Sequence, residues 1–292
     1  MIGTASIHKL GHGTFATIWL ARDQRKAAYV AVKVGTADAQ NREAEILRAI
    51  ADSTASSADP RWRAMIPIIH DEFEIQGPNG RHRCLVTLVL AVAYTHGRGC
   101  GHGDIHLGNA LIRLPSNFNL LSIDQLYETF EARLLLSDFG ESFYPSREKR
   151  TGHECHAPRP VMPPEAYFEP DEALSFPSDI WTLACAIWSI LTPRALFDAT
   201  LATAHDITSQ QVDKVGPLPA DWWNRFETDV QRYRQRDNMG EFCQDETGAI
   251  VGMLRSMLKF KPEQRATAKQ VLESEWMVKW ALPEFENVLD GS

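Results

Sequence analysis

The 292-residue sequence lacks the features of a membrane or secreted protein. No apolar run reaches the roughly 20 residues that a membrane span needs. The N-terminus has no basic segment followed by an apolar stretch, which is the pattern of a signal peptide. We therefore expect an intracellular protein, cytoplasmic or nuclear, that does not bind membranes.

Cysteine is scarce, and basic charge is not in excess. The five cysteines are odd in number, lie far apart and form no Cys-x-x-Cys spacing, which indicates ordinary thiols rather than a disulfide or zinc framework. With 30 Lys and Arg against 38 Asp and Glu, the formal net charge is -8, which argues against a nucleic-acid partner. The acidic excess lies after residue 90, either as a solvated surface or as a groove that attracts a basic peptide.

The composition and patterns indicate a folded chain in two parts. Hydrophobic residues make up 44% of the sequence, and its length is near the point at which a single core stops growing. Before residue 91, strand patterns surround one helix, which is expected at residues 39–51. The predicted strands are residues 7–10, 16–21, 29–34, 66–73 and 83–90. After residue 91 long helices dominate, including a nearly all-apolar and therefore buried one at residues 178–191. We predict a small lobe at residues 1–90 and a large, helical lobe at residues 91–292.

A glycine-containing turn joins the first two predicted strands. Within residues 10–18 (LGHGTFATI), Gly11 and Gly13 would let backbone amides approach phosphates closely, although Ala16 takes the place of a third glycine. On the third strand, the two-residue alternation places Lys33 beside Ala31 on one face, under the turn. A lysine in that position can act as a point charge for a phosphate.

The predicted helix supplies a partner for Lys33. Glu43 lies three, four and seven residues before apolar positions, so it shares their face of the helix. An ionised carboxylate on that face is costly unless it is paired, and Lys33 is the obvious cation. Two alternatives remain: Glu43 reaches solvent, or Glu45 takes its place if the helical register differs by two residues.

A third group of residues combines two aspartates and an asparagine. Asp104 and Asn109 lie within His-Gly-Asp-Ile-His-Leu-Gly-Asn, and Asp138 follows an apolar strand. Asp104 can orient a hydroxyl nucleophile and accept its proton, while Asn109 and Asp138 offer the hard oxygen ligands that Mg²⁺ prefers. Any one of them alone would usually be a turn or cap residue, but the ordered set indicates phosphoryl transfer.

Taken together, these motifs resemble a eukaryotic protein kinase, and most closely the SR-protein kinase-like group of fungi. The resemblance covers nearly the whole chain. Pro163-Pro-Glu165 is similar to the motif that closes the activation segment, and Arg265 to the arginine that pairs with that glutamate. Residues 178–181 (SDIW) resemble the start of the central helix, and residues 216–222 resemble an insert of SR-protein kinases.

The resemblance implies an α+β, two-lobed kinase fold, with a five-stranded antiparallel sheet in the small lobe and with ATP and Mg²⁺ between the lobes. The implied reaction transfers the γ-phosphoryl group of ATP to a Ser or Thr hydroxyl of a protein, and the resemblance suggests Ser/Arg-rich acceptors. Asp104 is the implied catalytic base, Lys33 paired to Glu43 contacts the phosphates, and Asn109 and Asp138 hold Mg²⁺. The other implied nucleotide contacts are Leu10, Gly11, Gly13, Ile18 and Ala31.

Two residues of the catalytic loop depart from the kinase pattern. Gly103 stands where many protein kinases have an arginine that grips a phosphate on the activation segment, so we predict that activation does not depend on a phosphate held there. His106, also counted among the catalytic residues, replaces a lysine, and an unperturbed imidazole is mostly uncharged at neutral pH. The same pattern resembles aminoglycoside- and choline-type small-molecule kinases, but Glu165 and Arg265 argue against that alternative.

The connection before the catalytic loop is short. Between Leu90, the expected end of the strand that leads to the adenine-binding hinge, and His102 there are eleven residues. Protein kinases place the hinge and two helices here, and one average helix takes about 11 to 12 residues. We therefore expect weaker nucleotide binding, and a pseudokinase or scaffold is the alternative function.

Overall fold

The computed structural model describes residues 4–12, 16–23, 28–35, 45–47, 49–50, 81–113, 133–192, 194–200, 202–223 and 244–283. For the first three strands the description is of the backbone. Among the described residues, no helix combines the length and the apolar character that crossing a membrane requires.

An antiparallel sheet begins the chain. Its strands are β1 (Thr4–His12), β2 (Ala16–Asp23) and β3 (Ala28–Gly35), paired in chain order. They confirm the strands predicted at residues 7–10, 16–21 and 29–34. The register places Gly11 opposite Ile18 and Ile18 opposite Lys33, so the turn glycine and the lysine lie in one row across the sheet.

The strand predicted at residues 83–90 is wrong. These residues belong to α3 (Arg81–Gly97), a helix that leads directly into the catalytic loop. A continuous apolar run fits a buried strand or a buried helix equally well, because neither shows a periodic pattern. The predicted lobe boundary at residue 90 consequently falls inside a helix. The strand predicted at residues 66–73 lies outside the described residues.

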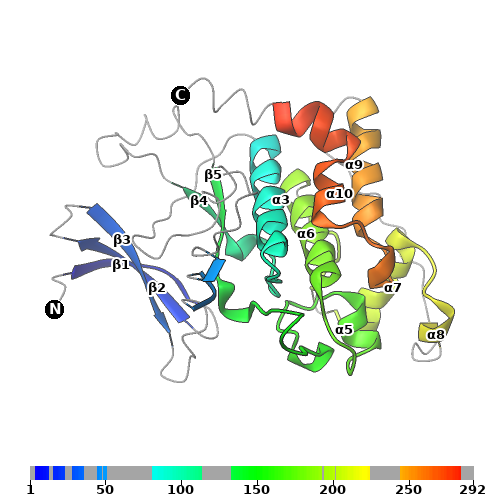
Figure 1. Cartoon of the computed structure of the whole chain (residues 1–292), viewed down its shortest axis with the longest axis horizontal. Coiled ribbons are helices and arrows are strands. Elements are labelled where there is room, and N and C mark those ends of the chain that lie inside the picture. The colour runs from blue at the N-terminus through cyan, green and yellow to red at the C-terminus, as the bar shows by residue number, and fades with distance from the viewer. Residues whose placement is uncertain are drawn as a thin grey trace.

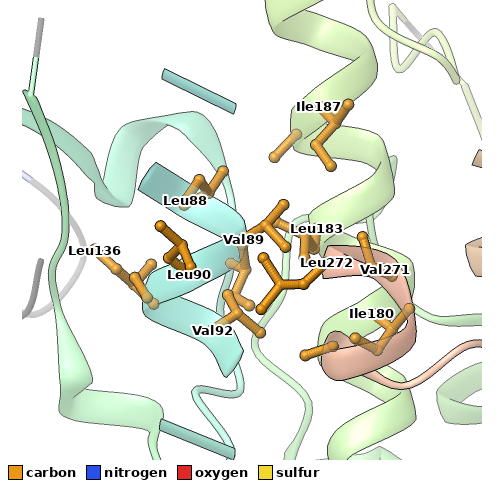
Figure 2. Packing of buried hydrophobic residues seen from close by; sticks show 14 of the residues in the cluster. Leu88, Val89, Leu90, Val92, Leu136, Ile180, Leu183, Ile187, Val271 and Leu272 are labelled. Carbon is orange, nitrogen blue, oxygen red and sulfur yellow. The ribbon is translucent and has the colours of Figure 1, made fainter. Parts of the chain in front are cut away.

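Packing explains why this run forms a helix. The neighbours of α3 in the main core include β5 (Arg133–Leu136), α6 (Phe176–Leu191) and α10 (Ala268–Leu272). Leu88 to Val92 are no more than 2% exposed. In Figure 2 the labelled side chains of this run, those of residues 88–90 and 92, lie between Leu136 on one side and Leu183 and Val271 on the other. A strand would bury two faces, whereas the helix buries its apolar side chains all round.

The helix predicted at residues 39–51 is helical at residues 45–47 and 49–50. Ile46, Leu47 and Ile50 are buried in the main core, while Glu45 is exposed. The predicted apolar face is therefore confirmed, and Glu45 is not the inward-facing carboxylate. Glu43 itself lies outside the described residues.

The remaining elements belong mostly to the large lobe. They are β4 (Ala110–Arg113), α5 (Pro164–Phe168), α7 (Ala204–Val215), α8 (Ala220–Trp223), α9 (Gln244–Met257), 3-10 turns at Leu107–Asn109, Phe139–Glu141, Gly152–Glu154 and Pro262–Gln264, and a π-helical turn at Met277–Ala281. The buried helix predicted at residues 178–191 is confirmed as α6. Figure 1 shows the N-terminal sheet at one end, the helices at the other and the β4–β5 pair between them. This is the two-lobed arrangement expected of the chain.

Candidate active site

The β4–β5 pair brings Asn109 and Asp138 to one end of a short ladder. Ala110, the first residue of β4, pairs with Leu136, the last residue of β5. Ser137 ties the two ends together, since its backbone N–H and its hydroxyl both donate to the carbonyl of Asn109, at 2.8 and 3.0 Å. Asp138 follows Ser137 directly. Two residues that are 29 positions apart in sequence therefore meet at the same edge.

Asp138 adopts a backbone conformation that few residues tolerate. Its φ of 61° and ψ of 69° place it in the left-handed region, where among the described residues it is the one non-glycine residue with positive φ. Such strain persists only where the surroundings enforce it, and it concentrates at functional sites. The conformation marks Asp138 as a residue whose position is imposed by the site.

Asp104 is held by Asn109. The Nδ2 group of Asn109 donates to the carbonyl oxygen of Asp104 at 2.9 Å and to its Oδ2 at 3.1 Å. The other carboxylate oxygen, Oδ1, is buried and has no hydrogen-bond partner within the described part of the chain. A buried and unpaired carboxylate oxygen is energetically costly, so this atom calls for a hydrogen-bond donor that the described residues do not supply.

His102 holds the backbone of Asp104. Its Nδ1 accepts a hydrogen bond from the Asp104 backbone N–H at 3.3 Å, so its Nε2 carries the hydrogen that is donated to the Ser137 carbonyl at 3.0 Å. Burial lowers the pKa of His102, which keeps the imidazole neutral at physiological pH. The ring also packs edge-on against Phe139. His102 thus links the strand end near Asp138 to the backbone of Asp104.

Asp179 fixes the catalytic loop, a role that the sequence did not indicate. It lies in α6, is 2% exposed, and accepts hydrogen bonds from the backbone N–H groups of His102 and Gly103 at 2.7 and 2.8 Å. His96 of α3 lies 2.8 Å from the same carboxylate. Burial alone would raise the pKa of Asp179, but these hydrogen bonds and charges lower it overall. The signal that could have revealed this role is an aspartate inside an almost wholly apolar helix, where it needs partners.

His106 points toward Asp104. Its Nδ1 accepts from the Gly108 backbone N–H at 3.0 Å, and its Nε2 lies 3.5 Å from Oδ2 of Asp104. The hydrogen bond with Asp104 raises the pKa of His106, although burial opposes that shift. The imidazole therefore carries positive charge over a wider pH range than the unperturbed ring assumed from the sequence.

The donor atoms at this edge fit a magnesium ion. Because Nδ2 of Asn109 is occupied by Asp104, its carbonyl oxygen lies on the opposite edge of the amide, and Asp138 adds a carboxylate. Mg²⁺ commonly uses one or two such protein oxygens together with substrate phosphates. Among the described residues, no cluster of three or more His, Cys, Asp or Glu side chains forms an alternative metal site.

Several predicted nucleotide contacts are placed by their backbone. Leu10 and Gly11 lie in β1, Ile18 in β2, and Ala31 and Lys33 in β3. Their side chains lie outside the description, as do Gly13 and Glu43 entirely. The predicted Lys33–Glu43 pair therefore stays a prediction.

The predicted pair of Glu165 and Arg265 is confirmed. The Nη1 and Nη2 atoms of Arg265 donate to the two carboxylate oxygens of Glu165 at 2.8 and 2.6 Å, and both residues are buried. Ser178 donates a further hydrogen bond to the same carboxylate at 2.9 Å. The end of the activation segment is thereby joined to α6 and to the C-terminal part of the chain.

The tryptophan of the 216–222 segment is a packing element. Trp222 is buried and stacks on Phe168 with ring centroids 4.8 Å apart. Its Nε1 donates to Glu169 at 2.9 Å, and Lys261 lies over the indole ring at 4.6 Å. These contacts attach α8 to the helix that follows the activation segment.

Three potential metal ligands of the activation segment point to different partners. His153 pairs with Asp171 at 3.3 Å, and His156 pairs with Glu141 at 2.8 Å. Cys155 lines a small cavity, and burial raises its pKa to about 11, so it is a protonated thiol. The three side chains therefore do not converge on one site.

Comparison of the sequence with known protein families gives one match. The sequence model of the protein kinase domain matches residues 69–277. That match includes Asp104, Asn109 and Asp138 but begins after β3, so it does not include Gly11 or Lys33.

Individual relatives extend the similarity. A serine/threonine protein kinase of Aspergillus fumigatus is 24% identical over 344 aligned positions, covering 93% of this chain and 84% of the relative. A serine/threonine-protein kinase SRPK of Physarum polycephalum is 21% identical and covers 93% of this chain and 85% of the relative. Mouse SRSF protein kinase 3 is 36% identical over 89 residues, which are 29% of this chain and 15% of that protein. The 344 aligned positions exceed the 292 residues of the chain, so the Aspergillus protein has residues that find no counterpart here.

Proposed function

The chain belongs to the protein kinase family, and from this premise we propose that it transfers the γ-phosphoryl group of ATP to Ser or Thr hydroxyls of a protein substrate. The observation that carries the proposal is Asp104, with one oxygen held by Asn109 and the other buried without a partner. An acceptor hydroxyl is the group that satisfies the second oxygen. Relatives named as serine/threonine kinases support this choice of acceptor.

Each residue of the site then has a role that its contacts permit. Asp104 accepts or orients the proton of the hydroxyl. Asn109 and Asp138 would hold Mg²⁺, which neutralises charge on the phosphates when it is bound. His106, whose pKa is raised by its hydrogen bond with Asp104, places an imidazole beside that carboxylate, and Lys33 with Glu43 would contact the α/β-phosphates. His102 and Asp179 are buried and position the loop through its backbone.

A Ser/Arg-rich peptide is the substrate class that we propose. The support is the similarity to an SRSF protein kinase over 89 residues and the acidic balance of the chain after residue 90. A basic peptide is attracted by such a field. A small-molecule acceptor is disfavoured, because the buried Glu165–Arg265 pair organises an activation segment of the protein-kinase kind.

Replacing one carboxylate tests the proposal. Purified chain is incubated with Mg-ATP and a Ser/Arg-rich peptide, beside an Asp104→Asn variant and an Asp213→Asn control, in which the aspartate is exposed on α7. Because positioned acid–base groups contribute about 10²- to 10⁴-fold, Asp104→Asn should lose at least about 100-fold in turnover. The control should retain its activity.

The outcomes separate enzyme from pseudokinase. Phosphopeptide formed by wild type and control but not by Asp104→Asn supports the kinase. Equal background from all three chains, together with a melting temperature that Mg-ATP does not raise, indicates a scaffold. ADP released with aminoglycosides or choline and no peptide would instead indicate a small-molecule kinase.

A further inference from the structure

Glu141 and Arg150 form an ion pair where the activation segment meets the catalytic loop. We propose that the carboxylate of Glu141 takes the place of an activating phosphate, so that Glu141 and Arg150 hold the activation segment in its ordered conformation in the unmodified chain. Both are then positioning residues for the phosphoryl transfer proposed above, on which this inference rests.

Arg150 binds Glu141 through both of its Nη atoms. Its Nη1 donates to the backbone carbonyl of Glu141, its Nη2 donates to Oε2 of the same residue, and its Nε reaches the carbonyl of Glu154 at 3.3 Å. His156 adds a contact of 2.8 Å to Oε2 of Glu141. The side chains of Arg150 and Glu141 are only 16% and 21% exposed, so solvent screens the pair less than a surface pair. Charge-assisted, forked hydrogen bonds of this type fix geometry as well as adding energy.

The Glu141–Arg150 pair fills the space beside residue 103, the position at which many protein kinases carry a phosphate-binding arginine. Gly103 has a φ of +82°, and a Cβ atom built on it would lie 2.5 Å from the carbonyl oxygen of Glu141. This carbonyl is the one that Arg150 binds, and Nη1 of Arg150 would lie 3.5 Å from the same Cβ. Any side chain at residue 103 would therefore displace the pair. In this chain Arg150 of the activation segment supplies the guanidinium, and the carboxylate of Glu141 supplies the negative charge that it binds.

The Glu141–Arg150 pair also connects the start of the activation segment, near Phe143, with the region after α5, near Leu174. Phe143, two residues after Glu141, exchanges backbone hydrogen bonds with Gly101 at 2.9 and 3.0 Å. The guanidinium of Arg150 lies 5.6 Å from the centre of the Phe143 ring. On the far side, the carbonyl of Arg150 accepts from the Leu174 N–H at 2.7 Å. Movement of Arg150 would thus be transmitted both to the catalytic loop and to the region after α5.

The neighbouring hydroxyl is poorly placed to carry an activating phosphate. Thr151 donates to Oε2 of Glu154 through both its backbone N–H and its hydroxyl, at 2.8 and 3.0 Å. These hydrogen bonds lower the pKa of Glu154, so its carboxylate is ionised at neutral pH. A phosphate on Thr151 would meet that negative charge and weaken the turn at Gly152–Glu154.

The first test uses limited trypsin digestion, which does not depend on activity. Arg147, Lys149 and Arg150 are tryptic sites in the segment. Glu141→Gln keeps the shape of the side chain and removes its charge, and Glu275→Gln, at an exposed pair with Lys279, is the matched control. Because a charged hydrogen bond is lost, cleavage after Lys149 and Arg150 should be at least roughly tenfold faster in Glu141→Gln than in wild type. The control should digest like wild type.

The second test measures turnover in phosphatase-treated protein whose unmodified state is verified by mass spectrometry. Wild type should be fully active, while Glu141→Gln should lose at least about tenfold in kcat. The double variant Glu141→Gln/Arg150→Gln should be no slower than the slower of its two single variants, Glu141→Gln and Arg150→Gln, because paired residues are not additive.

Equal trypsin protection in Glu141→Gln and Glu275→Gln overturns the inference, as does wild-type turnover that appears only after Thr151 is phosphorylated. A wild-type chain that is inactive in every modification state overturns the proposed function instead. In that case the trypsin comparison alone decides whether Glu141 and Arg150 hold the segment.

Discussion

The imidazole of His106 is placed by a glycine two residues later. A Cβ atom at Gly108 would lie 2.8 Å from Cε1 and 2.9 Å from Nδ1 of the His106 ring, closer than such atoms can approach. The absence of a side chain at Gly108 is therefore what lets its N–H bind Nδ1 and direct Nε2 toward Asp104. The sequence pattern identified His106, but the dependence on Gly108 requires coordinates.

Gly108→Ala should therefore reproduce the loss of His106. We expect kcat to fall about tenfold, the value for roughly 1.4 kcal/mol of lost stabilisation, in both Gly108→Ala and His106→Ala. His106→Lys, which keeps a positive charge near Asp104, should retain activity. Steady-state kinetics with the peptide substrate provide the measurement.

Gly252→Ala is the matched control for this substitution. Gly252 lies in α9, and nothing lies within 4 Å of a Cβ atom built there. Alanine in a helix interior is favoured over glycine by roughly 0.5–1 kcal/mol, so this variant should be slightly more stable and equally active. If Gly108→Ala behaved like Gly252→Ala, the position of the His106 ring would not matter to catalysis.

At the scale of helices and strands, the sequence predicted the alternating strands and the long apolar helix, and it failed for the shorter apolar run at residues 83–90. The alternation in β1 to β3 and the apolar character of α6 identified those elements correctly. The first half of α3 was assigned to a strand, because its secondary structure depends on packing partners far away in sequence. Asp104, Asn109 and Asp138 were recognised by motif, whereas Asp179 was missed, since its role depends on backbone N–H groups 76 and 77 residues away.

The connection between α5, α6 and the C-terminal helices depends on one buried ion pair. Arg265 donates to Glu165 twice, and also to the carbonyls of Lys259, Pro177 and Phe260 at 2.7, 2.9 and 2.9 Å. Arg265→Ala would leave a buried carboxylate unpaired, so the free energy of unfolding should fall by about 3–5 kcal/mol. Chemical denaturation of the purified variant measures this loss.

The exposed pair of Lys269 and Glu273 is the comparison for that experiment. Its atoms are 3.8 Å apart, four residues apart on the helical surface, and its side chains are 84% and 63% exposed. Removing Lys269 should change the free energy of unfolding by no more than about 0.5 kcal/mol. Similar losses in the two variants would show that burial does not distinguish these pairs.

For the molecule as a whole, α3 changes how the two lobes are joined. The residues expected to end the small lobe form the start of a helix in the core of the large lobe, and that helix leads into the catalytic loop. The site for Asp104, Asn109 and Asp138 is complete on the large-lobe side. The eleven residues counted between Leu90 and His102 therefore do not measure the connection between the lobes, because Leu90 lies inside α3. Weaker nucleotide binding stays a prediction, and it concerns the adenine base rather than the groups that handle the acceptor hydroxyl and the metal.

We expect Mg-ATP to bind this chain about tenfold more weakly than it binds a relative with additional residues, since two net backbone hydrogen bonds at roughly 0.5–1.5 kcal/mol each account for such a factor. The Aspergillus fumigatus kinase is a suitable reference, because its alignment is longer than this chain. Calorimetric titration of Mg-ATP into the Asp104→Asn variant avoids turnover, and the corresponding variant of the relative is treated in the same way. Equal dissociation constants would mean that the adenine finds its backbone partners elsewhere and that α3 costs nothing in nucleotide affinity. A weaker constant with normal turnover at saturating ATP would place the effect of α3 on binding alone.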